Sequence, residues 1–287
     1  MIYLLLSISA STCIFIIFKL LDKYNIDTLQ TIVINYIAAC LFGLWSYEAP
    51  ISMTSILESK WVYGALGLGF LFITIFNVMA LTAQRNGLSV ASVASKMSVI
   101  IPIIFGIYVY KEGIGIQKVI GIILALVSVY LTSVKPKVTG NASKGLWLPI
   151  LLFFGSGVID TSIKYFETTY VPKNGIPLFS ATIFAFAFIM GFVFLIYKSI
   201  KKPKKFTVKA VIAGSILGVV NYFSIYYLLK ALNHESLESS TLFTVNNVAI
   251  VMVSTLLGLL IFKESITKKN WLGIALAIIS IVLVTLA

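Results

Sequence analysis

Long apolar runs separated by short polar gaps make up almost the whole sequence. A helix needs about 20 residues to cross the ~30 Å hydrocarbon core of a bilayer, and ten runs are close to that length. The runs are far longer than a spanning β-strand and lack its strict alternation of apolar and polar positions. The pattern therefore predicts an all-α integral membrane protein with ten transmembrane helices. The predicted spans are residues 2–18, 29–46, 61–83, 88–110, 115–133, 146–166, 177–197, 208–231, 237–262 and 270–287.

Composition supports the membrane prediction, because 59% of the 287 residues are hydrophobic and only 11% are charged. A soluble domain is about 45–50% apolar, with about a quarter of its residues charged. The formal net charge is +12, which in a soluble protein would suggest nucleic-acid binding. Here the cations lie in the short gaps between apolar runs, as is typical of a membrane surface. We therefore expect the lipid bilayer, and no nucleic acid, as a partner.

An internal repeat links the two halves of the chain. Residues 111–131 and 263–283 share nine identities in 21 positions. Both segments begin with Lys-Glu and later carry Gly-Ile, Leu-Ala and Ser at the same helical phase. We interpret the Lys-Glu pairs at 111–112 and 263–264 as lying at helix ends and capping the turns there. The repeat predicts two five-helix domains, 1–134 and 146–287, joined by a linker at 135–145.

Five is an odd number of spans, so the second repeat enters the membrane from the side opposite to the first. The two halves then form an inverted repeat, related by a pseudo-two-fold axis in the membrane plane. In such proteins the substrate site lies near the bilayer midplane between the halves, and rocking of one bundle against the other gives alternating access.

This arrangement resembles the EamA-type branch of the drug/metabolite transporter superfamily. The resemblance lies in the five-plus-five spans and in the apolar-Lys-Glu ending followed by Gly-Ile-x-Leu-Ala-x-x-Ser in both halves. Pro102 matches a proline frequent in the family, whereas the second half has Val253-Ser254. The resemblance implies that spans 1, 3, 4, 6, 8 and 9 line a central cavity and that spans 5 and 10 lie outside it. The expected location is the bacterial inner (plasma) membrane.

Two charged residues lie deep inside predicted spans, where a charge costs about 2.5–3.5 kcal/mol. At 1.5 Å per helical residue, Lys96 is roughly 12 Å from one membrane face and Asp160 roughly 20 Å from the same face. Either residue can serve a cavity, with Lys96 attracting a carboxylate or phosphate and Asp160 acting as counter-charge or proton carrier. The alternatives are a structural Lys96–Asp160 ion pair, or pairing of Asp160 with Lys164 one turn later.

Polar stripes accompany these charges at positions that the repeat makes equivalent. Asn247 corresponds to Lys96 at an offset of 151 residues, and it shares one helix face with Ser240 and Thr244. Ser92 shares the face of Lys96 in the same way. The stripes fit a wet cavity, and they also fit polar contacts between packed helices. The remaining candidates for substrate binding are Asn77, Asn221, Tyr222 and Tyr226.

We expect a secondary transporter of a small polar metabolite, such as an amino acid, working as an exporter or exchanger. The sequence has no Walker-type ATP-binding loop, no carboxylate pair and no Cys/His cluster, so we expect neither an enzyme nor a cofactor or metal. An exchanger of anionic solutes is the first alternative, and a structural or lipid-handling membrane protein is the second. Protons as coupling ion and the oligomeric state stay open. Lys/Arg counting places both termini outside, whereas the resemblance implies cytoplasmic termini.

Overall fold

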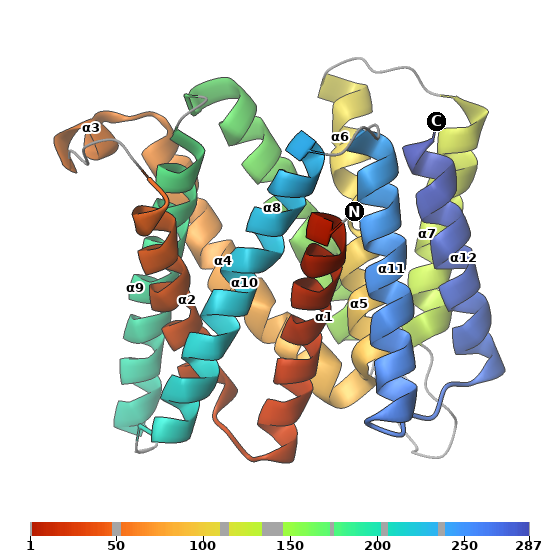
Figure 1. Cartoon of the computed structure of the whole chain (residues 1–287), viewed down its shortest axis with the longest axis horizontal. Helices are drawn as coiled ribbons and strands as arrows, with labels where there is room; N and C mark the ends of the chain where they lie inside the picture. The colour runs from red at the N-terminus through yellow and green to blue at the C-terminus, as the bar shows by residue number, and fades with distance from the viewer. Residues whose placement is uncertain are drawn as a thin grey trace. The chain divides into compact units, whose positions relative to one another are not determined.

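In the computed structural model, every secondary-structure element of the described residues is a helix (Figure 1). It describes residues 2–47, 53–109, 115–133, 146–172, 175–201, 206–234 and 239–286. The predicted linker at 135–145 and the Lys-Glu pair at 111–112 lie outside these residues. The helices are α1 (Ile2–Lys23), α2 (Thr28–Trp45), α3 (Met53–Glu58), α4 (Trp61–Asn86), α5 (Leu88–Met97), α6 (Ile100–Val109), α7 (Ile116–Ser133), α8 (Trp147–Tyr170), α9 (Ile176–Lys201), α10 (Val208–His234), α11 (Ser239–Leu260) and α12 (Lys268–Thr285).

The all-helical, multi-span prediction is confirmed. Within the described residues, seven segments are long and apolar enough to cross a membrane, and two shorter apolar helices accompany them. Every predicted span contains a helix, since span length is set by the thickness of the bilayer and can be read from the apolar runs.

The sequence predicts a single span at residues 88–110, whereas the structure has two helices there, α5 and α6. The break between α5 and α6 falls at Ser98 and Val99. Pro102 explains it, because proline has no N–H to donate to the carbonyl four residues earlier and its ring collides with that carbonyl. The carbonyl is that of Ser98, which instead accepts from Ile101 N at 2.9 Å in a tighter turn. The prediction missed this kink although Pro102 was visible.

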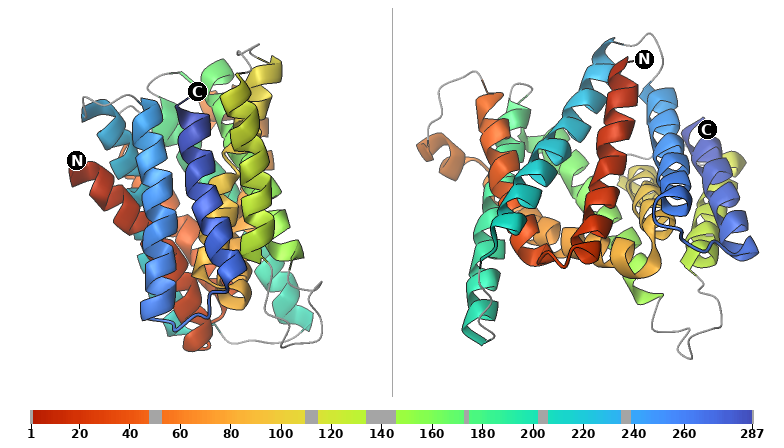
Figure 2. Two further views of the ribbon diagram at one scale, coloured as in Figure 1. Left: turned by 90° about the vertical axis from the view of Figure 1, so that its right-hand side faces the viewer. Right: turned by 60° about the horizontal axis from the view of Figure 1, so that its bottom comes forward.

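The chain forms two compact units, and each draws residues from both predicted repeats. Unit 1 comprises Met1–Leu20, Val78–Val158 and Phe223–Ala287, and unit 2 comprises Leu21–Asn77 and Ile159–Tyr222. In unit 1, α7 lies along α12, while α11 packs against both α5 and α12 (Figures 1 and 2). In unit 2, α2 lies along α9.

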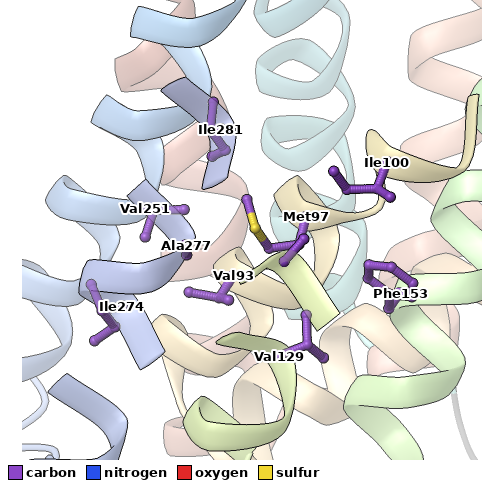
Figure 3. Close-up of a cluster of buried hydrophobic side chains, with 10 residues drawn as sticks. Val93, Met97, Ile100, Val129, Phe153, Val251, Ile274, Ala277 and Ile281 are labelled. Atoms are coloured by element: carbon purple, nitrogen blue, oxygen red, sulfur yellow. The ribbon is translucent and has the colours of Figure 1, made fainter. Parts of the chain in front are cut away.

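The core of unit 1 is a cluster of apolar side chains around α5 (Figure 3). Val93 and Met97 of α5 are fully buried and lie among residues of α7, α8, α11 and α12. In a bilayer such side chains hold helices together by van der Waals packing, because lipid tails are as apolar as they are. The cluster therefore holds α5 against α11. Its remaining members are Ile100, Ala125, Val129, Phe153, Val251, Ile274, Ala277 and Ile281.

Unit 2 is held by close helix packing and by a buried tyrosine. Tyr36 is fully buried, and its hydroxyl donates to the Phe72 carbonyl at 2.8 Å. Gly214 and Gly218 of α10, spaced as Gly-x-x-x-Gly, let that helix approach α2. A Cβ at Gly218 would lie 2.6 Å from the Ala38 Cβ and 2.6 Å from the Asn35 carbonyl oxygen. Small residues at this spacing permit backbones of membrane helices to touch.

Candidate functional site

Glu264 caps the N-terminus of α5 in unit 1. The backbone N–H of Leu88, the first residue of α5, donates to both Glu264 carboxylate oxygens at 3.0 Å. The first N–H groups of a helix have no partner inside it and carry partial positive charge, so a carboxylate is stabilised there. The sequence predicts a cap at the turn where Lys263-Glu264 itself lies, but Glu264 caps a helix of the other predicted repeat.

Lys19 of α1 completes this arrangement. Its Nζ lies 3.2 Å from Glu264 Oε1, and it donates to the carbonyls of Ala83 and Gln84 at 3.3 and 3.2 Å. These carbonyls belong to the last turn of α4, the negative end of that helix. The side chains of Lys19 and Glu264 are only 20% and 12% exposed. The pair therefore joins α1, the α4–α5 turn and the segment after α11, and we call it the clasp.

Two glycines make room for the Glu264 carboxylate. A Cβ at Gly87, or at Gly258, would lie 2.7 Å from Glu264 Oε2. Gly87 also has φ of +108°, a conformation that L side chains rarely adopt. A side chain at either position would displace the Glu264 carboxylate, and at Gly87 it would also strain the backbone.

A pocket of about 390 Å³ opens beside the clasp, entirely within unit 1. Its charged lining consists of Lys19, Arg85, Lys263 and Glu264, so cations outnumber the one carboxylate. Arg85 and Lys263 are exposed at its rim. Polar side chains complete the wall, namely Asn86, Ser89, Thr132, Ser265 and Asn270.

Lys96 lies two turns into α5 from the clasp. It is half-buried between the fully buried Val93 and Met97, and the helix breaks two residues after it. Ser92, on the same face, is fully buried, and its hydroxyl donates to the Ser89 carbonyl of its own helix at 3.1 Å. That hydroxyl is satisfied without a second helix.

Asn247 lies in α11, the helix that packs against α5. It is 9% exposed, and its neighbour Asn246 is 2% exposed. The Oδ1 atom of Asn246 has no hydrogen-bond partner among the described residues. Sequence reasoning missed Asn246 because it does not share the helix face of the predicted stripe. The backbones of Ser240 and Thr244 lie in α11, and their side chains lie outside the described part of the chain.

In unit 2, Asn221 bonds to Asn35 of α2. Its Nδ2 donates to Asn35 Oδ1 at 3.3 Å, and both side chains are buried. The Nδ2 of Asn35 has no hydrogen-bond partner in the described ranges. Asn35 was not predicted, although an amide inside a 20-residue apolar run is a signal that sequence inspection can use.

The other candidate residues lie in different surroundings. Tyr222 forms a hydrogen bond with Ser46 and stacks on Phe42 at 5.6 Å. Asn77 donates to the Ile73 carbonyl of its own helix at 2.7 Å. Asp160 of α8 is exposed. Tyr226 belongs to unit 1, with Lys96, Ser92 and Asn247.

Comparison with known proteins identifies the family. Residues 143–286, just over half of the chain, match the EamA-like transporter family. The chain belongs to this family. An uncharacterized protein of Haemophilus influenzae is 30% identical over 284 residues, which cover 97% of this chain and 95% of that protein. A solved structure, described as the crystal structure of a protein, is similar to this chain in fold. The alignment covers 99% of this chain and 96% of the chain in that structure, with a TM-score of 0.59 and 15% sequence identity.

Membership of the EamA-like transporter family confirms the resemblance drawn from the sequence. With the seven candidate spans it makes the protein a multi-pass membrane protein of a transporter family. Within the described residues, no group of three or more His, Cys, Asp or Glu side chains could hold a metal ion.

Proposed function

We propose that this EamA-family protein is a secondary transporter of a small polar organic metabolite, such as an amino acid. It works as an exporter or exchanger in the bacterial inner membrane. Lys96 and Asn247 carry the proposal, because the repeat makes them equivalent and they lie on two helices packed against each other in unit 1. A cation and an amide at matched positions can bind a polar solute in both orientations of an alternating cycle.

The packing pattern supports two inverted five-helix repeats as the basis of that cycle. The helix pairs α7 with α12, α2 with α9, and α5 with α11 are each in contact. Each pair joins the same span of the first and second predicted repeats. Contacts between equivalent spans are what a two-fold axis between the repeats produces.

The break between α5 and α6 supports placing the solute near Lys96. Transporters with inverted repeats commonly bind solutes at interrupted membrane helices, where backbone groups are released from the helix. Here the interruption at Ser98 and Val99 follows Lys96 closely. Separately, the Oδ1 of Asn246 in α11 is unpaired among the described residues, and a buried acceptor without a donor costs about 1–3 kcal/mol. A solute N–H or O–H would remove that cost.

An exchanger of anionic solutes is the second candidate, and Lys96 is the observation that favours it. In that case the ammonium binds a carboxylate or phosphate directly. Proton coupling would instead require a titrating group, and the exposed Asp160 of unit 2 is our candidate for it.

The test is solute flux into liposomes that contain the purified protein. A panel of amino acids, organic acids and sugar phosphates is offered to the native protein and to the Lys96→Gln variant. We expect saturable flux of one class, lost in Lys96→Gln and kept in Lys268→Gln, which removes an exposed lysine at the start of α12. Absence of flux for the whole panel would favour a structural or lipid-handling role. Native kinetics in Lys96→Gln would remove the role of Lys96.

A further inference from the structure

A lysine lies against two aromatic rings near the beginning of α1 and the end of α10, within unit 1. Lys230 Nζ lies 5.0 Å from the centroid of the Tyr226 ring and 5.5 Å from that of Tyr3. The Tyr227 ring stacks on Tyr3 at 6.4 Å and on Phe223 at 5.3 Å. We call the four rings of Tyr3, Phe223, Tyr226 and Tyr227 the aromatic cage; Tyr3 and Tyr226 face the ammonium, and Phe223 and Tyr227 pack against those two rings or each other.

The cage is assembled by two helices that are hydrogen-bonded to each other beside it. The three cage residues of α10 and the lysine follow at i, i+3, i+4 and i+7, so they share one helix face. The hydroxyl of Ser7 in α1 donates to the Ser224 carbonyl of α10 at 2.9 Å. This bond is buried and holds the fourth ring, from α1, beside the other three.

The cage stabilises the positive charge of Lys230, which lies just beyond the candidate span Val208–Leu228. A hydrogen bond with Tyr226 is the largest cause of a raised pKa of Lys230, and desolvation opposes it. Aromatic faces attract cations through the ring quadrupole, within about 6 Å of the centroid. Several rings around one cation are the arrangement that binds quaternary and methylated ammonium groups.

We infer that the aromatic cage is a binding site for an organic ammonium group, and that Lys230 occupies it as an internal substitute. The inference goes beyond the proposed function, because it places an ammonium site at the aromatic cage and not at Lys96 and Asn247. A soluble amine and the ammonium headgroup of a lipid share this chemistry. Both would compete with the Lys230 side chain for the same rings.

The test measures binding of choline to the protein purified in a maltoside detergent, by titration calorimetry. Lys230→Met removes the internal cation and keeps an apolar chain of similar length. We expect this variant to bind choline roughly tenfold or more tightly than the native protein does. The neutral isostere 3,3-dimethyl-1-butanol should show no such gain. Equal gains for both probes, or no gain for choline, would overturn the inference and leave Lys230 as an interface anchor.

Lys201→Met is the matched control. Lys201 Nζ lies 4.6 Å from the centroid of the Tyr197 ring, at the end of α9. Its removal uncovers one tyrosine and no cage, so choline affinity should not change. A gain equal to that of Lys230→Met would contradict a requirement for the cage.

Two further measurements test the contribution of the rings and the identity of the occupant. Adding Tyr226→Leu to Lys230→Met should abolish the increase in choline affinity. If that double variant fails to fold, Tyr3→Leu, which removes a ring on the other helix, replaces Tyr226→Leu in the same test. The increase in choline affinity caused by Lys230→Met is then measured in nanodiscs. If the increase is present in phosphatidylglycerol and is lost when phosphatidylethanolamine is added, the lipid headgroup is the occupant. A gain seen in both identifies a soluble amine. Because binding is measured without transport, failure here leaves the flux result standing, and absence of flux leaves the binding result standing.

Discussion

The Nζ atom of Lys19 lies 3.2 Å from Oε1 of Glu264, and each charge also faces a helix end of opposite polarity. Lys19 binds carbonyls at the negative end of α4, and Glu264 binds the first N–H at the positive end of α5. The ion pair and the two helix ends therefore stabilise one another. This arrangement distinguishes the clasp from an ordinary ion pair, in which only the two side chains matter.

Removing the charge of Glu264 should destabilise unit 1. In Glu264→Gln the amide keeps the shape of the carboxylate but leaves the Lys19 ammonium without its counter-charge. Loss of one partner from a buried pair costs about 3 kcal/mol, which we expect as a lower unfolding temperature of the protein in detergent. Glu58→Gln, which changes an exposed carboxylate of α3, should leave that temperature unchanged. Equal melting of the two variants would show that the clasp contributes no stability.

Exchanging the two charges should not rescue the clasp. In the double variant Lys19→Glu/Glu264→Lys the side chains can still attract each other. Each charge, however, then faces the helix end of its own sign, which costs about 0.3–1 kcal/mol per end when exposed and more when buried. We expect the double variant to melt below the native protein and no higher than Glu264→Gln. Recovery of native melting would reduce the clasp to a simple ion pair.

Substitution of Gly218 should loosen α10 from α2 in unit 2. In Gly218→Ala the new methyl would meet the Ala38 Cβ and the Asn35 carbonyl at 2.6 Å, so one helix must shift. Overpacking of this kind costs about 1–3 kcal/mol, measured as the change in unfolding temperature. Gly67→Ala is the control, since nothing lies within 4 Å of a Cβ there, and it should be neutral or stabilising by about 0.5–1 kcal/mol. The reverse order of stability would contradict the close approach of α10 to α2.

The positions of the helices could be predicted from the sequence because bilayer thickness sets the length of each apolar run. The family could be inferred from the sequence because its Lys-Glu and Gly-Ile motifs are local and occur in the same order in both halves of the chain. Partners far apart in the chain were not readable. Glu264 caps a helix that begins 176 residues earlier, and no local pattern distinguishes that cap from one at its own turn.

The candidate site was predicted in part. The depth of Lys96 in the bilayer stays a prediction drawn from its position in an apolar run; the structure shows the residue half-buried in α5. Asn35 and Asn246 were overlooked, since neither belongs to the stripes that the repeat pointed to. Each has a buried amide atom that is unpaired among the described residues, and this is visible only once the neighbouring helices are placed.

The Asn35–Asn221 pair should respond unequally to loss of its two members. Asn221→Leu leaves both polar atoms of the fully buried Asn35 without a partner in the described ranges, at about 1–3 kcal/mol for each newly unpaired group. Asn35→Leu removes an amide whose Nδ2 is already unpaired there, so it should destabilise less. Adding Asn35→Leu to Asn221→Leu should recover part of the lost stability. Melting temperatures of the three variants test this order, and strictly additive losses would show that the two amides do not interact.

Pro102 should matter more for transport than for stability. Pro102→Ala restores an N–H that can donate to the Ser98 carbonyl, so α5 and α6 can join into one helix, with a gain of up to about 3 kcal/mol. The interruption after Lys96 is proposed to release backbone groups for the solute. If it does, the Pro102→Ala variant should lose most of the native solute flux in liposomes. Its unfolding temperature should equal or exceed that of the native protein. Pro149→Ala is the control, because Pro149 lies in the first turn of α8, where the missing N–H would have no partner in the helix. Native flux in Pro102→Ala would show that transport does not use the break, and reduced flux in both variants would point to a general effect of proline removal.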